Sequence, residues 1–143
     1  MKIAIGSDHA GYEYKSYLAG KLKEWGVGVV DYGTDSSESV DYPDFAHPVA
    51  EAVGEDRNIN LGILICGTAN GVCMTANKHP KVRAAICWNK SLAELARQHN
   101  NANIICIPAR FVSKRMAGIM VKAFINSSFE GGRHKRRVGK ISC

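Results

Sequence analysis

Short runs of apolar residues alternate along the chain with stretches in which apolar residues recur every three or four positions. An apolar run bounded by turn residues is typical of a buried strand, and recurrence at the helical period is typical of a helix with one apolar face. The expected strands are residues 2–6, 27–30, 61–66, 82–87 and 104–107, and the expected helices are residues 14–25, 45–53, 71–77, 90–98 and 113–126. This alternation predicts an α/β fold, a Rossmann-like αβα sandwich with a five-stranded parallel sheet.

Two local signals refine the expected helices. Asp44 has the side chain of a helix cap and is expected to begin the second helix. In residues 90–98 the spacing predicts that Leu92, Leu95 and Ala96 face inward.

The parallel topology predicts where the chemistry lies. The carboxyl ends of parallel strands share one edge of the sheet, so Asp8, His9 and Cys66 are expected to converge there. The connection over residues 31–43 is long and polar, and a connection of that length inside a compact domain is often functional.

The net positive charge of the chain is concentrated near its C-terminus. The 143 residues suffice for one domain with a substantial core, and we expect residues 1–143 to form a single domain. Much of the net charge of +6 lies in a basic C-terminal tail, residues 127–143, which suits a small anion or a partner surface better than a nucleic-acid duplex. The basic residues of this tail are Arg133, Lys135, Arg136, Arg137 and Lys140.

The cysteines and the apolar runs indicate a compartment. An odd number of cysteines, five, with three that end or interrupt apolar runs, indicates reduced thiols in a cytoplasmic protein. No cysteine or histidine cluster has the spacing of a zinc site, so no structural metal is expected. The N-terminal apolar stretch is too short for a signal peptide, and no apolar run has the length of a membrane span, so no membrane partner is expected.

Cys66 and the loop that follows it are the main candidate site. Cys66 is either a plain buried thiol or a reactive one at a strand end. The segment Gly67-Thr68-Ala69-Asn70-Gly71 favours the second reading, because such loops bring backbone N–H groups close to a ligand. The loop fits neither the P-loop nor the dinucleotide-binding pattern, so no nucleotide cofactor is expected.

The other candidates each have two interpretations. His99 either ends its helix as a cation at the negative end of the helix dipole or belongs to a site. Asp8 and His9 form either a solvated turn or part of the same site. Arg133 and Arg137 are four residues apart, so a helical tail would present both guanidinium groups on one side, as a phosphate grip or as a solvated charge run.

Six blocks of the sequence decide between these interpretations. They are Gly-Ser-Asp-His-Ala-Gly (6–11), Ser-Val-Asp-Tyr-Pro (39–43), Ile-Leu-Ile-Cys-Gly-Thr (63–68), Ala-Asn-Lys (76–78), Arg-Gln-His-Asn (97–100) and Glu-Gly-Gly-Arg-His (130–134). In this order the chain resembles the type B ribose-5-phosphate isomerases, whose family includes allose-6-phosphate and galactose-6-phosphate isomerase relatives. The resemblance covers essentially the whole chain.

The resemblance implies an aldose-ketose isomerase that interconverts ribose 5-phosphate and ribulose 5-phosphate. It implies that Cys66 is the base that moves a proton between C2 and C1, that Thr68 lies in the cradle for the enediolate, and that His99 assists ring opening. The implied substrate-binding residues are Asp8, His9, Tyr42, Gly67, Ala69, Asn70, Gly71, Asn100, Arg110, Arg133 and Arg137. It also implies a homodimer or a dimer of dimers in which a second subunit completes each site.

Three expectations follow for the chemistry. Ala69 stands where the family usually has glycine, which would strain the loop if that position needs a positive φ. A thiol base at neutral pH requires a depressed pKa, which we expect the N–H groups of the loop and the following helix to supply. No cluster of carboxylates and histidines has suitable spacing for a metal, which favours proton transfer over a metal-dependent hydride shift.

Other functions stay open at this point. The chain could isomerise a six-carbon sugar phosphate, such as allose or galactose 6-phosphate. It could be a non-catalytic sugar-phosphate sensor in which Cys66 is a redox switch. A nucleic-acid binder that uses the basic tail is the poorest fit, and it predicts steep salt dependence.

Overall fold

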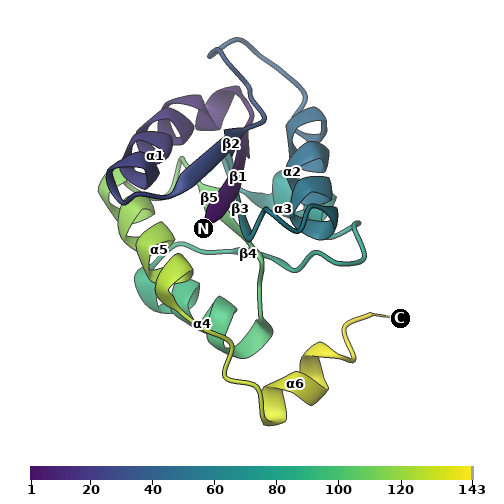
Figure 1. Ribbon diagram of the computed structural model, residues 1–143. Helices are drawn as coiled ribbons and strands as arrows, with labels where there is room; N and C mark the ends of the chain where they lie inside the picture. Colours follow the sequence, from purple (N-terminus) through teal and green to yellow (C-terminus); the bar gives the residue numbers. More distant parts are fainter. Residues whose placement is uncertain (143) are drawn as a thin grey trace.

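In the computed structural model, which describes residues 1–142, the strands form one parallel sheet in the order β2-β1-β3-β5-β4 (Figure 1). All neighbouring strands pair in parallel. The strands are β1 Lys2–Ser7, β2 Gly28–Asp31, β3 Leu61–Cys66, β4 Ala84–Ile86 and β5 Ile104–Pro108. The predicted five-stranded α/β fold is therefore confirmed.

Helices cover both faces of this sheet (Figure 1). They are the 3-10 turn η1 His9–Gly11 and the α-helices α1 Tyr12–Glu24, α2 Pro43–Glu55, α3 Asn70–Ala76, α4 Lys90–Asn100, α5 Lys114–Asn126 and α6 Arg133–Val138. Helices α1, α4 and α5 pack on one face, and α2 and α3 pack on the other. No helix within residues 1–142 is long and apolar enough to cross a lipid bilayer.

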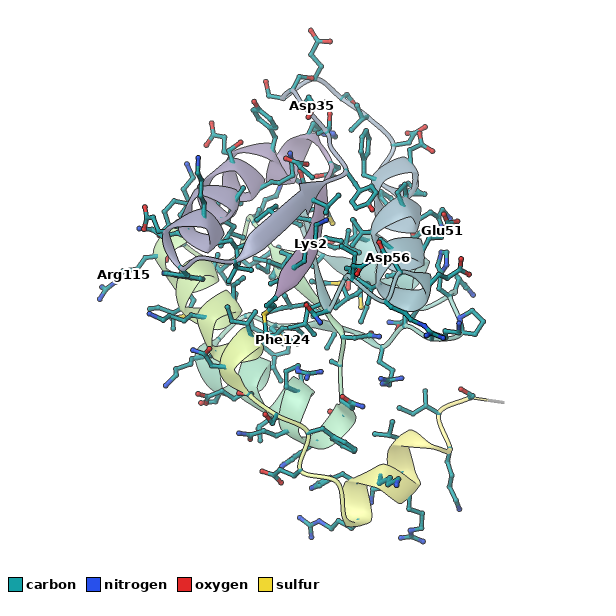
Figure 2. All side chains as sticks on the ribbon, viewed as in Figure 1. Lys2, Asp35, Glu51, Asp56, Arg115 and Phe124 are labelled. Carbon is teal, nitrogen blue, oxygen red and sulfur yellow. The ribbon has the colours of Figure 1, made fainter. Side chains whose placement is uncertain are left out.

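Successive side chains along the strands point to opposite faces of the sheet and so form two separate cores. In β3, Ile63 and Ile65 point to the α1, α4 and α5 side, whereas Leu64 and Cys66 point to the α2 and α3 side. This follows from the two-residue period of a strand, which sends successive side chains to opposite faces. Phe124 of α5 closes the first core and has no exposed surface (Figure 2). Cys66 thus belongs to the core under α2 and α3.

Several local expectations are wrong. Tyr42, not Asp44, is the N-cap of α2, because Pro43 already has the helical φ and lacks the N–H that a cap would satisfy. In α4, Ala96 faces the core and Leu92 packs against it, as predicted, but Leu95 is 41% exposed and Ala93 is buried instead. The small alanine side chains let α4 pack closely on α5, which the leucine spacing did not reveal.

Smaller boundary differences concern strand and helix ends. β4 covers only Ala84–Ile86 of the expected 82–87, because it is an edge strand that pairs with β5 alone over those residues. Helix α4 continues to Asn100, so His99 lies inside its last turn. Residues 133–138 form a helix, which is the condition under which Arg133 and Arg137 lie on one side.

The parallel sheet has two chemically different edges. The carboxyl ends of the strands lead into η1, the 31–43 connection, the loop before α3 and the turn after β5. Asp35 lies at the outer tip of that connection (Figure 2). At the opposite edge, α4 ends just before β5 begins, and α6 packs beside α4 (Figure 1).

Candidate active site

Cys66 is the last residue of β3 and is only 5% exposed. The chain after β5 holds the loop in place, because the N–H of Ala109 donates to the Cys66 carbonyl at 2.9 Å. The N–H of Arg110 donates to the Gly67 carbonyl at 3.0 Å. The thiol therefore sits on a rigid strand end with the loop fixed on one side.

Backbone N–H groups surround the sulfur of Cys66. The N–H groups of Val72, Ala69 and Thr68 all lie against it, since the loop turns sharply into α3. N–H groups that converge at a helix start favour a negative charge. The loop thus has the arrangement expected of an anion cradle.

Burial nevertheless decides the protonation state of this thiol in the single chain. Removal from water raises the pKa of Cys66; the N–H groups of Val72, Ala69 and Thr68 oppose that change, and the nearby Asp8 carboxylate adds to it. The expected depression of this pKa is therefore wrong for the chain on its own. The N–H donors are present, but they do not offset the cost of burying a thiolate.

Asp8 and His9 bracket the mouth of the site. The Oδ1 atom of Asp8, which is buried, accepts from the Gly11 N–H at 3.1 Å and so caps η1. The Asp8 N–H donates to the carbonyl of Ile65 at 3.3 Å, which places this residue beside Cys66. The Nδ1 atom of His9 accepts from the Val40 N–H at 3.3 Å. His9 thereby fixes the end of the long polar connection at the site.

Two glycines of the loop allow large side chains to approach its backbone. A Cβ built on Gly71 would lie 2.5 Å from Cζ of Tyr42, so the tyrosine ring packs directly on this glycine. A Cβ on Gly67 would lie 3.1 Å from Cζ of Arg110. Tyr42 and Arg110 therefore flank the loop, one on each side of the turn into α3.

Ala69 lies in the left-handed region, with φ of 63° and ψ of −6°. Position 69 therefore has the positive φ at which an alanine is strained. For an L-residue this conformation costs roughly 1–2 kcal/mol. The Ala69 methyl group is fully buried in the α2 and α3 core.

The predicted site residues fall into two groups. Those at the carboxyl edge of the sheet are Asp8, His9, Tyr42, Cys66, Gly67, Thr68, Ala69, Asn70, Gly71 and Arg110. His99 and Asn100 lie instead at the opposite edge, because α4 runs against the strands and β5 begins only a few residues later. Arg133 and Arg137 are exposed on α6, which packs beside α4. A single chain does not bring the two groups together.

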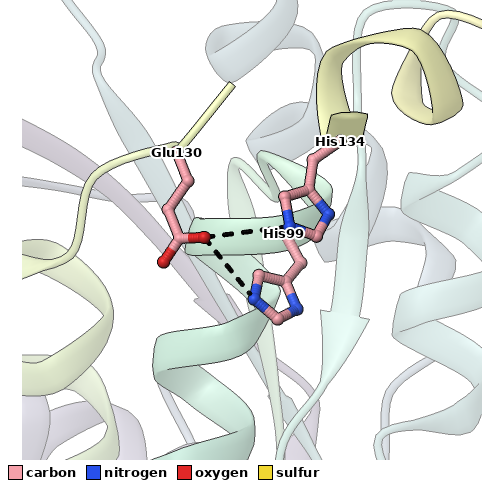
Figure 3. A group of neighbouring side chains, drawn as sticks. All are labelled: His99, Glu130 and His134. Carbon is pink, nitrogen blue, oxygen red and sulfur yellow. Dashed lines mark ion pairs between the residues drawn. The ribbon is translucent and has the colours of Figure 1, made fainter. Parts of the chain in front are cut away.

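His99 lies in a compact cluster at its own edge (Figure 3). Its Nε2 atom is 3.7 Å from Oε2 of Glu130, and the same oxygen is 3.8 Å from Nε2 of His134. The two imidazoles stack with centroids 4.2 Å apart and planes 9° from parallel. Burial and the neighbouring His99 lower the pKa of His134.

The sequence analysis assigned no role to Glu130 or His134. Their spacing of four residues was a visible signal, but their contact with His99 depends on tertiary structure. The N–H of Glu130 donates to the Gln98 carbonyl at 3.0 Å, which holds the tail against α4. The sequence spacing indicated no cluster of carboxylates and histidines suited to a metal, but the fold brings these three side chains together.

A cleft of about 420 Å³ opens beside the Cys66 loop. Its lining includes Thr68 and Asn70 from the loop and two aromatic side chains, Trp88 and Phe111, which are 57% and 73% exposed. Large exposed aromatic side chains beside a polar site are typical of surfaces that bind another molecule.

Comparison with known proteins shows the family of the chain. The model of a family described as Ribose/Galactose Isomerase matches residues 3–141. The chain therefore belongs to the ribose/galactose isomerase family.

Several similar proteins are named ribose-5-phosphate isomerase B. The chain is 43% identical to ribose-5-phosphate isomerase B of Escherichia coli, over 99% of this chain and 95% of that protein. It is 49% identical, with a TM-score of 0.96, to a structure of ribose-5-phosphate isomerase B from Clostridium thermocellum, covering 99% and 95% of the two chains. A structure of the Mycoplasma genitalium enzyme with bound ribulose-5-phosphate is 46% identical, with a TM-score of 0.94 over 98% and 93% of the two chains.

Proposed function

We propose that the chain interconverts ribose 5-phosphate and ribulose 5-phosphate through a cis-enediolate, with Cys66 as the base. The observation that carries this proposal is the Cys66 thiol at the carboxyl end of β3, faced by the N–H groups of Thr68, Ala69 and Val72. The similarity to an enzyme whose structure holds ribulose-5-phosphate supports the choice of sugar.

The reaction moves one proton between neighbouring carbons. The Cys66 thiolate removes the proton from C2 of the open-chain aldose, and the electron pair of the broken C–H bond shifts toward the C1 carbonyl oxygen. The N–H groups of the loop, with Thr68, stabilise the enediolate that forms, as an oxyanion hole does. The thiol then gives the proton to C1, while the C2 hydroxyl proton passes to the oxygen on C1 and C2 becomes the carbonyl carbon.

Sugar binding at this edge of the sheet involves the side chains around the loop. Asp8 and His9 would contact the sugar hydroxyl groups, and Tyr42 would cover the ring. Arg110, whose guanidinium lies against Gly67, is placed to reach an anionic group bound at the same loop. The cleft beside Thr68 and Asn70 provides the room.

Ring opening and phosphate binding require the second group of residues. We propose that a second copy of the chain contributes His99, Asn100, Arg133 and Arg137 to this site, in a homodimer or a dimer of dimers. The separation of the two groups on opposite edges of one chain supports this arrangement. The basic tail, residues 127–143, would then complete the neighbouring site; Cys143 lies outside the described residues.

Assembly also accounts for the protonation state of the base. In the single chain, burial raises the pKa of Cys66. Guanidinium groups supplied by a second copy would favour the thiolate, because a cation within a few ångströms stabilises a negative charge. The base would therefore become active only in the assembled site.

Replacing the base tests the proposal. Cys66→Ala is expected to reduce turnover of ribose 5-phosphate by several orders of magnitude, because it removes the sulfur that the loop N–H groups face and that takes the C2 proton in the proposed mechanism. The variant should still bind ribulose 5-phosphate, measured by calorimetry. Cys87→Ala is the matched control, since Cys87 is equally buried but belongs to the opposite core. Near-normal turnover by Cys66→Ala would refute the assignment.

A turnover panel separates the remaining alternatives. The family description names galactose as well as ribose, so allose and galactose 6-phosphates are the other substrates to compare with ribose 5-phosphate. Faster turnover of a six-carbon phosphate would correct the sugar and keep the chemistry. Saturable binding with no turnover of any of the three would favour a sugar-phosphate sensor.

A further inference from the structure

The cluster of His99, Glu130 and His134 has the composition of a metal site. Two imidazoles and one carboxylate form the donor set of several zinc enzymes, in which the fourth position is left for water or another ligand. Three nitrogen and oxygen donors from α4, α6 and the segment before α6 meet here, all within 4.8 Å of one another (Figure 3). No other such group of three occurs in residues 1–142.

The distances from the Glu130 oxygen to the two histidine nitrogens are close to those around a bound ion. A tetrahedral ion with bonds of about 2.0–2.1 Å holds its donor atoms roughly 3.4 Å apart. Oε2 of Glu130 lies 3.7 Å from Nε2 of His99 and 3.8 Å from Nε2 of His134. Each of these two carboxylate–imidazole pairs therefore has to move together by only a few tenths of an ångström, and all three donor atoms already lie within 4.8 Å of one another.

One of the two imidazole rings has to rotate before both can bind the same ion. A ligating imidazole holds the ion in its own plane, and the two planes are now nearly parallel. The His99 side chain is 37% exposed and that of His134 is 11% exposed. His99 is thus the ring with room to turn toward an ion held by Glu130 and His134.

The surroundings limit the affinity. Arg133 and Arg137 lie close enough to His134 to lower its pKa, and the same positive charges oppose a bound cation. Glu130 supplies one negative charge against them. Weaker binding than that of a structural zinc site is therefore expected.

We propose that His99, Glu130 and His134 bind a divalent transition-metal ion of the zinc type. A bound ion uses the Nε2 lone pair of His99, so that imidazole can no longer exchange a proton with a sugar ring. The consequence, which rests on the proposed function, is that the ion inhibits turnover of cyclic ribose 5-phosphate.

Metal titration of the full chain tests the site without using activity. Zinc is titrated into the metal-stripped protein and measured by competition with a chromophoric chelator, and cobalt is added separately to detect the absorption of a tetrahedral ion. One equivalent is expected to bind. In His134→Gln and Glu130→Gln the affinity should fall by about tenfold or more.

A second histidine pair provides the matched control. Nδ1 of His47 and Nε2 of His79 are 2.8 Å apart on the exposed surface, without a third ligand. His79→Gln should leave the measured affinity unchanged. No binding up to millimolar zinc, or a loss that follows His79→Gln and not His134→Gln, would overturn the proposal. Because binding is read directly, a chain that binds zinc but isomerises no sugar would refute only the proposed function.

Discussion

The loop after β3 consists of residues with small side chains or none, because Tyr42 and Arg110 pack directly on its backbone. At Gly71 any side chain would collide with the tyrosine ring. Tyr42 is 41% exposed and can be displaced outward. The main effect of a larger residue at this position is therefore on the site and not on the fold.

Gly71→Ala tests this point. A Cβ 2.5 Å from Tyr42 forces the ring away from the loop, and we expect the KM for ribose 5-phosphate to rise several-fold with a smaller change in kcat. Gly20→Ala is the control, because nothing lies within 4 Å of a Cβ at that position of α1. It should raise the free energy of unfolding by about 0.5–1 kcal/mol and leave KM unchanged. Equal KM values in both variants would show that Tyr42 does not cover the sugar.

Ala69→Gly sets two opposing effects against each other. Glycine relieves the left-handed strain, which is roughly 1–2 kcal/mol. Against this, it removes a buried methyl group worth about 0.8 kcal/mol, and the greater conformational entropy of the unfolded chain lowers the free energy of unfolding by a similar amount. The free energy of unfolding should therefore change by less than about 1 kcal/mol. Urea unfolding checks this result, and a change above about 2 kcal/mol would mean that the strain is absorbed elsewhere.

Periodicity located the secondary-structure elements well because each helix or strand buries one continuous face. Periodicity failed where a neighbouring helix or residue decides which side chains are buried or where a helix begins. Leu95 has the right spacing for a core position, yet Ala93 is buried in its place, beside the correctly predicted Ala96. Asp44 has the right side chain for a cap, yet Pro43 moves the helix start to Tyr42.

Cys106 in β5 and Cys87, directly after β4, are buried thiols, and their burial predicts a pH dependence of stability. Burial raises the pKa of Cys87 from 9.0 to about 12, and burial also raises that of Cys106 well above its ordinary value. Each thiol stays protonated in the folded state at pH values where the unfolded chain has lost the proton. The free energy of unfolding should therefore be constant below pH 9 as far as these groups are concerned, and fall as the pH rises from 9.0 toward 12.

Urea unfolding under reducing conditions measures this effect. Each such thiol contributes at most about 1.4 kcal/mol per pH unit in that range. Cys87→Ala should be less stable at neutral pH because a small cavity forms, but its stability should fall less steeply above pH 9. Tyrosine and lysine titration is common to both proteins and cancels in the comparison. Parallel slopes for the two proteins would contradict the predicted role of Cys87.

For the whole molecule, the sequence predicted which residues meet at the carboxyl ends of the strands but not which residues lie together at the opposite edge of the sheet. Asp8 directly follows β1 and Cys66 ends β3, so parallel topology alone places them together. His99 is in the last turn of α4, which runs against the strands and ends near the start of β5. Its contact with Glu130 joins segments 31 residues apart, and no local pattern encodes such a contact.

Mixing two inactive variants tests the shared site. Cys66→Ala disables the residue group at the carboxyl edge of the sheet, and His99→Asn disables the group at the opposite edge. Each variant alone should be nearly inactive toward ribose 5-phosphate. When the two are co-expressed with different affinity tags, half of the dimers combine both chains, and each of these holds one intact site. Activity should therefore recover to about a quarter of the wild-type value.

A second mixture provides the control for this experiment. Cys66→Ala co-expressed with Asp8→Ala places both changes in the same residue group, so every composite site contains one defect and no activity should return. If the first mixture also stays inactive although the tags show mixed dimers, a second copy does not complete the site.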